Sequence, residues 1–146
     1  MDDVRGAVNV ILYGPAEDFD RTLALIQEAG ITAKRDAFQK RAISAFFHDG
    51  TEHPSVAYVR ECEDRVRALV EGTSFVVDRT GVWSSNAATR QLPVNRHTGE
   101  WLGTFIDSEA RLEVREEILR GLATAYGISV TDIELRDPDY LNPPEA

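Results

Sequence analysis

The chain has 146 residues, a formal net charge of −9 at pH 7 and a hydrophobic content of 42%. This length is typical of one globular domain, and the composition argues against a wholly disordered chain. The excess of acids repels phosphate backbones and anionic lipids, which disfavours general nucleic-acid or membrane binding. The sequence shows no secretory pattern and no long apolar segment, and its single cysteine excludes an internal disulfide. We therefore expect a cytoplasmic protein with one domain over residues 1–146.

Three segments have the apolar periodicity of helices, and each ends at a glycine. The first helix is expected within residues 15–30 and the second within residues 54–72, each with a proline at its start. The third is expected within residues 107–127, with Asp107 or Ser108 as the residue that caps its first turn.

Apolar or alternating runs predict strands between these helices. Residues 8–13 are nearly all apolar, as in a strand that is covered on both faces. Residues 31–38 alternate weakly and are polar enough for a solvated or edge strand. Residues 42–47 are a better strand, with Ile43, Ala45 and Phe47 on one face. A further strand is expected over residues 75–83, with a bend or bulge at Gly81.

The order of these elements over residues 7–80 is strand, helix, strand, strand, helix, strand. This order predicts an α+β fold with a ferredoxin-like βαββαβ antiparallel core and both helices on one face of the sheet. Residues 81–136 are expected to add a strand/helix/strand extension, with strands at 101–105 and 128–135. Residues 137–146 contain three prolines and predict an extended tail.

Residues with catalytic or metal-binding chemistry do not form a recognised pattern. Residues 48–53 hold two histidines and two carboxylates, but their spacing matches no zinc motif and is typical of an exposed turn. Cys62 lies on the apolar stripe of the second helix beside Glu61 and Glu63, so we expect it to be buried and unreactive. Nucleotide-binding glycine loops and a serine-hydrolase elbow are absent. We expect no cofactor, no metal and no catalytic set.

The clearest local anomaly is a window without acids over residues 79–99. It contains Arg79, Arg90, Arg96 and His97, together with Trp83, whereas the rest of the chain is strongly acidic. Arginine binds oxyanions in bidentate geometry, so these five residues are the predicted binding site for a phosphate, a carboxylate or an acidic peptide. The alternative is that the arginines pair with acids elsewhere in the fold. We predict that the three arginines do not all serve as structural ion pairs and that at least two of them converge on an exposed, anion-accepting surface.

Two function hypotheses follow. The first is a non-enzymatic acidic binding protein, for example an inhibitor or immunity-type antagonist of a basic protein partner, because acidic complementarity speeds association with a basic target. The second is a small-molecule-binding domain or small enzyme that takes an anionic substrate through residues 79–99. An exposed sheet is also compatible with a homodimer.

Overall fold

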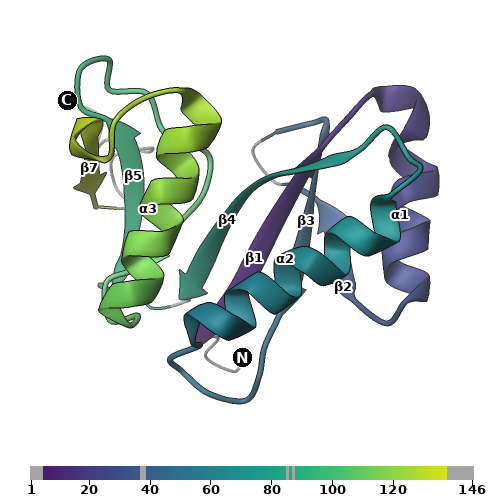
Figure 1. The fold of residues 1–146 in the computed structure, drawn as a ribbon, viewed down its shortest axis with the longest axis horizontal. Helices are drawn as coiled ribbons and strands as arrows, with labels where there is room; N and C mark the ends of the chain where they lie inside the picture. The colour runs from purple at the N-terminus through teal and green to yellow at the C-terminus, as the bar shows by residue number, and fades with distance from the viewer. Residues whose placement is uncertain (1–4, 37–38, 85, 87, 138–146) are drawn as a thin grey trace.

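The computed structural model describes residues 5–36, 39–84, 86 and 88–137 (Figure 1). The described chain contains three α-helices, two single-turn 3-10 helices and two antiparallel sheets, which confirms the expected α+β class. In chain order the elements are β1 (Arg5–Tyr13), η1 (Ala16–Asp18), α1 (Phe19–Glu28), β2 (Thr32–Arg35), β3 (Ala42–Phe47), α2 (Val56–Val70), β4 (Val76–Ser84), β5 (Arg90–Asn95), β6 (Ile106–Asp107), α3 (Leu112–Tyr126), η2 (Val130–Asp132) and β7 (Ile133–Arg136).

The first sheet has the strand order β2-β3-β1-β4, and each neighbouring pair is antiparallel. Successive side chains of a strand point to opposite faces, and one face of β1 carries Val8, Val10 and Leu12. These three side chains are buried in a core that includes Ile26 of α1 and Val66 of α2. α1 and α2 therefore cover the same face of this sheet (Figure 1). These two helices do not cover the opposite face.

The C-terminal ends of the first two helices agree with the sequence, but the proline starts do not. Pro15 precedes η1, so α1 begins only at Phe19, and Pro54 lies before the residue that caps α2. Gly30 and Gly72 follow α1 and α2 with φ angles of 83° and 91°, the left-handed region in which glycine is favoured. Ser55, one residue after the expected proline, caps α2 by accepting a hydrogen bond from the Tyr58 backbone N–H.

The start of the third helix was predicted wrongly. Neither Asp107 nor Ser108 caps α3, which begins after Arg111 without a side-chain cap. Asp107 belongs to β6 instead, and its Oδ1 accepts a hydrogen bond from the Glu109 backbone N–H, within the turn that precedes the helix. A capping residue and a turn-forming aspartate use the same type of hydrogen bond, so the sequence pattern could not separate them. The end of α3 at Gly127 agrees with the prediction.

The strand boundaries of the first sheet are close to the predicted ones, with two corrections. β2 is an edge strand, as expected, but spans Thr32–Arg35 within the predicted 31–38, of which residues 37 and 38 lie outside the described part. The irregularity in β4 is at Asp78 and not at Gly81: Ile11 pairs with Arg79 whereas Leu12 pairs with Val77, so Asp78 has no partner on β1.

The second sheet has the order β6-β5-β7 and is formed by the C-terminal part of the chain. The strand predicted at 101–105 is wrong: Trp101 makes only an isolated bridge to Val94, because Gly103 has a φ of 79° that no strand adopts. The strand predicted at 128–135 is interrupted by η2, and only its last part, in β7, pairs with another strand. Of the predicted tail at 137–146, residues 138–146 lie outside the described residues.

One continuous core joins the two parts of the chain. Val82 of β4 and Ile118 of α3 are buried in the same cluster as Val8 of β1. Leu102 and Ile106, which come from the second part, belong to it as well. Within the described residues no helix is long and apolar enough to span a bilayer.

Candidate functional site

The face of the first sheet opposite α1 and α2 presents its side chains in rows that run across the strands. Because the register of β1 with β3 and β4, and of β2 with β3, is fixed by hydrogen bonding, residues opposite one another share a face. Three rows result: Lys34, Ser44, Ile11 and Arg79; Thr32, Phe46, Asn9 and Gly81; and Ala7 with Trp83.

One side of this face is closed by residues 102–105, which run along β4. The Leu102 carbonyl accepts a hydrogen bond from Arg79 Nη1 at 3.2 Å, and the Phe105 carbonyl accepts one from the Val82 backbone N–H at 3.0 Å. The Phe105 ring then meets the Trp83 indole edge-on, with centroids 4.9 Å apart and an interplanar angle of 84°. Residues 102–105 therefore form a wall that rises from the β4 side of the sheet.

The floor of the face contains buried polar groups. Asn9 is 7% exposed and donates a hydrogen bond from Nδ2 to the Ala45 carbonyl at 3.4 Å. Ser44 is 3% exposed and donates to Asp36 Oδ2 at 2.7 Å, while Asp36 Oδ1 accepts from the Gln39 backbone N–H at 3.1 Å. Among the described residues the Asn9 carboxamide oxygen has no hydrogen-bond partner, so it is available to a donor from outside the chain.

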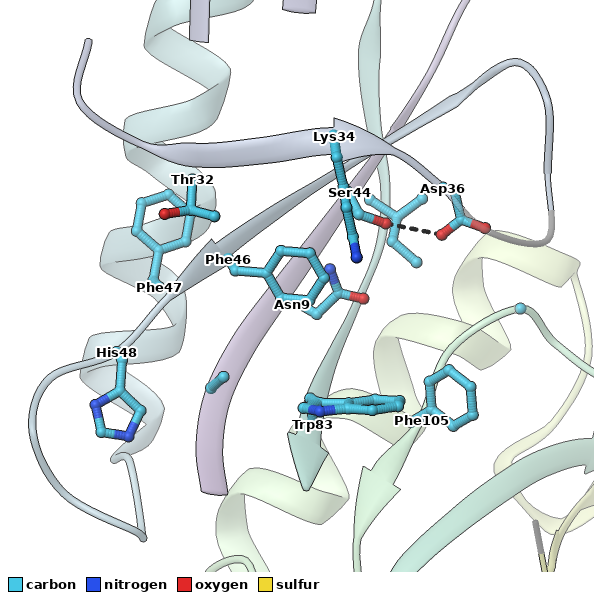
Figure 2. A pocket seen from close by; sticks show the side chains of 13 residues that line it. Asn9, Thr32, Lys34, Asp36, Ser44, Phe46, Phe47, His48, Trp83 and Phe105 are labelled. Carbon is cyan, nitrogen blue, oxygen red and sulfur yellow. Dashed lines mark hydrogen bonds between the residues drawn. The ribbon is translucent and has the colours of Figure 1, made fainter. Parts of the chain in front are cut away.

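Floor and walls together border an open hollow of about 680 Å³, which we call the sheet groove. Its aromatic walls are Phe46 on one side and Trp83 with Phe105 on the other, as Figure 2 shows. Lys34 reaches over the floor from β2, with its ammonium 5.6 Å from the centroid of the Phe46 ring. Small-molecule sites commonly have volumes of about 300–1,000 Å³ and combine apolar walls with a few polar groups, and the groove has both properties.

The structure separates the five residues that the sequence singled out. Arg79 lies on the groove face but its side chain is only 8% exposed, because residues 102–105 cover it. Its guanidinium is paired with Asp78 and lies 5.6 Å from the centroid of the Tyr126 ring. Arg79 therefore helps to hold the wall in place and does not present an open anion site.

Arg90 and Trp83 are in direct contact. The Arg90 guanidinium lies 4.5 Å from the centroid of the indole ring and 5.9 Å from that of Phe105, and its Nη1 donates to the Ser84 carbonyl at 3.5 Å. A cation over an aromatic face is attracted by the electrons of the ring. Arg90 thus supports the aromatic wall, although it does not line the groove.

Arg96 and His97 lie at the other end of β5. At the usual rise of about 3.3 Å per residue, the backbone of Arg96 is about 20 Å from that of Arg90. These two arginines therefore lie far apart, and Arg79, the third, is mostly covered. The Arg96 backbone N–H donates to the Asp132 carbonyl, and His97 Nε2 lies 2.8 Å from Asp132 Oδ1. Arg96 and His97 therefore flank η2 and are remote from the groove.

The other chemical groups that the sequence raised do not form a reactive centre. Cys62 is 2% exposed, and burial raises the pKa of its thiol to about 11, as expected for an inert side chain. Burial likewise raises the pKa of its neighbour Tyr58 to about 12. In the described part of the chain, residues 48–53 included, no group of three or more His, Cys, Asp or Glu side chains is placed to hold a metal ion.

Sequence reasoning missed most of the groove. Asn9 is polar within an otherwise apolar strand, which was a signal that one face of residues 8–13 is not ordinary core. Phe46 stands between two buried residues of β3, and Lys34 follows the buried Ala33 of β2, but only the register of the sheet brings the two side chains together. Phe105 reaches Trp83 through a long connection that no spacing rule describes. Comparison of the chain with protein-family models, with curated proteins and with solved structures finds no match.

Proposed function

We propose that this chain binds a small planar organic molecule in the sheet groove. The observation that carries the proposal is a hollow of about 680 Å³ between aromatic side chains, on the sheet face opposite α1 and α2. Phe46 and Trp83 offer ring faces and edges for stacking, and Asn9 offers a carboxamide oxygen. The proposal retains the small-molecule hypothesis from the sequence but moves its site from residues 79–99 to the groove.

The architecture around the groove supports a second part of the proposal, that the first sheet with α1 and α2 is a ferredoxin-like unit. The strand order β2-β3-β1-β4 and the two helical connections, from β1 to β2 and from β3 to β4, agree with a split βαβ arrangement. In such a unit one sheet face is left without helices, which is the face that carries the groove.

Two flat probes of equal size test the proposal: 2-naphthamide, which is neutral, and 2-naphthoate, which is an anion. Each is titrated into the ¹⁵N-labelled protein while the indole N–H signal of Trp83, assigned with Trp83→Phe, is followed by NMR. We expect a saturable shift with at least one probe. Phe46→Ala should weaken binding about two- to twelvefold, because an aromatic contact contributes about 0.5–1.5 kcal/mol.

Leu112→Ala is the matched control. Leu112 is a large apolar residue, 58% exposed on α3 and remote from the groove, so its removal should leave binding unchanged. Thermal melting of each variant establishes that it is folded. The proposal fails if neither probe shifts the Trp83 signal, or if Phe46→Ala and Leu112→Ala weaken binding equally. It also fails if the protein is a dimer that Phe46→Arg dissociates, because a second copy of the chain would then occupy the groove.

The charge of the chain favours a second candidate function, the antagonist of a basic protein. A net charge of −9 steers a basic partner toward the surface and raises its association rate. A partner captured from the native host should therefore associate more slowly as salt is raised, since exposed charges are screened over about 10 Å at 0.1 M. An association rate that does not change between low and high salt would exclude steering by charge.

A further inference from the structure

Lys34 places a positively charged group at the groove. Lys34 lies in the middle of β2, opposite Ser44 in register, and therefore on the groove face of the sheet. Figure 2 shows its side chain extending over the floor toward Phe46 and Asn9. The ammonium is thus placed beside the aromatic wall and above the polar floor, where a flat ligand would lie.

Lys34 has no carboxylate partner among the described residues, although the chain contains 25 acids. Some exposed cations do have a carboxylate partner, such as Arg60 with Glu117 at 2.6 Å and Arg21 with Asp18 at 3.0 Å. Others, such as Arg65 and Arg111, donate to backbone carbonyls instead. The only recorded contact of the Lys34 ammonium within the described part is the ring of Phe46. A positive charge without a paired anion therefore faces the groove of a strongly acidic protein.

Asp36 is the opposing charge on the same side of β2. Both of its oxygens already accept hydrogen bonds, one from Ser44 Oγ and one from the Gln39 backbone N–H, so the carboxylate is committed to the β2–β3 turn. Its negative charge also discourages an anion from binding over the turn. An anionic group is therefore directed toward Lys34, away from the Asp36 end of the groove.

From this arrangement we propose that the groove selects aromatic carboxylates. The ring of the ligand lies between Phe46 and Trp83, and its carboxylate accepts a charge-assisted hydrogen bond from the Lys34 ammonium. The inference rests on the proposed function, because it presupposes that flat molecules enter the groove, and it adds the charge of the ligand and the residue that recognises it.

The test compares the dissociation constants of 2-naphthoate and 2-naphthamide, which share ring and size but differ in charge. We expect the wild-type protein to bind 2-naphthoate about fivefold more tightly, as for a charge-assisted contact at an exposed site. Lys34→Gln should abolish this preference without changing the affinity for 2-naphthamide. Lys40→Gln is the matched control: Lys40 is the only other lysine, is exposed, lies in the β2–β3 turn and does not line the groove.

The outcomes separate this inference from the proposed function. Equal affinities for the two probes in the wild-type protein overturn the inference and leave the aromatic groove intact. A preference for 2-naphthoate that Lys34→Gln and Lys40→Gln reduce alike also overturns it, because net charge and not Lys34 would then be responsible. If Lys34 serves only to keep the edge strand from pairing with other chains, Lys34→Gln leaves the preference unchanged. If neither probe binds, the proposed function itself is wrong.

Discussion

Gly81 lies where residues 102–105 meet β4, and adding one methyl group there should separate them. A Cβ atom at this position would lie 2.5 Å from the Phe105 carbonyl oxygen and closer still to Thr104 Oγ1. The Phe105 carbonyl cannot move aside cheaply, because it accepts a hydrogen bond from the Val82 backbone N–H at 3.0 Å. Gly81→Ala should therefore push the wall of the groove away from the sheet.

The expected cost has two parts. Overpacking in a tightly packed site costs about 1–3 kcal/mol, and loss of the Val82–Phe105 hydrogen bond costs about 1 kcal/mol more. We expect Gly81→Ala to lower the free energy of unfolding by about 2–4 kcal/mol. Because Phe105 moves with its carbonyl, the edge-on contact with Trp83 is lost as well, and binding of 2-naphthoate should weaken.

Urea denaturation followed by circular dichroism measures the free energy of unfolding, and Gly121→Ala provides the matched control. Gly121 lies within α3, has no positive φ, and a Cβ there would meet nothing within 4 Å. The same chemical change should therefore stabilise the protein by about 0.5–1 kcal/mol, the difference in helix propensity between glycine and alanine. If Gly81→Ala proves as neutral or stabilising as Gly121→Ala, the close packing of residues 102–105 on β4 is refuted.

Two further predictions concern side chains outside the groove. Cys62 should react with a thiol reagent only on unfolding, because the thiol is buried and its pKa is raised to about 11, and rapid stoichiometric labelling of the native protein would contradict this. The pKa of Asp132 is lowered by the hydrogen bond from the Ser129 backbone and by His97. A lowered folded-state pKa adds stability above the ordinary value of 3.8, which is lost as pH falls through the folded value. Asp132→Asn should thus reduce the fall in melting temperature below about pH 4, and equal falls in both proteins would disprove the assignment.

Much of the first sheet could be predicted because its signals are local. The apolar stripe of α2 and the alternation in β3 each follow from the spacing of neighbouring residues, and Ala42–Phe47 was placed at its observed bounds. The structure of the C-terminal part was harder to predict, because the path of its backbone depends on contacts between residues that are distant in sequence. The run from Trp101 to Phe105 has the composition of a strand, but it packs along β4 and turns at Gly103.

The candidate site could be predicted only in fragments. Trp83 was recognised because it stands in a window without acids, and it does line the groove. Charge composition, however, says which residues lack acidic neighbours along the chain and not where their side chains lie. Arg79 forms an ion pair with Asp78, which lies just outside the window. Arg96 follows the end of β5 that is distant from Arg90. Lys34 was treated as a solvated strand residue, because its place over the groove depends on the pairing of three strands.

The groove is assembled from two parts of the chain that are far apart in sequence. Its floor comes from β1, β2 and β3, whereas Phe105 arrives from the segment that follows β5. The binding surface can therefore be complete only after the C-terminal part has docked onto β4. A ligand that contacts both Phe46 and Phe105 would stabilise the docked state over one in which the wall has detached, by mass action. Ligand binding would then be coupled to the docking of the C-terminal part onto β4. A bound molecule would stabilise the contact between the two parts of the chain.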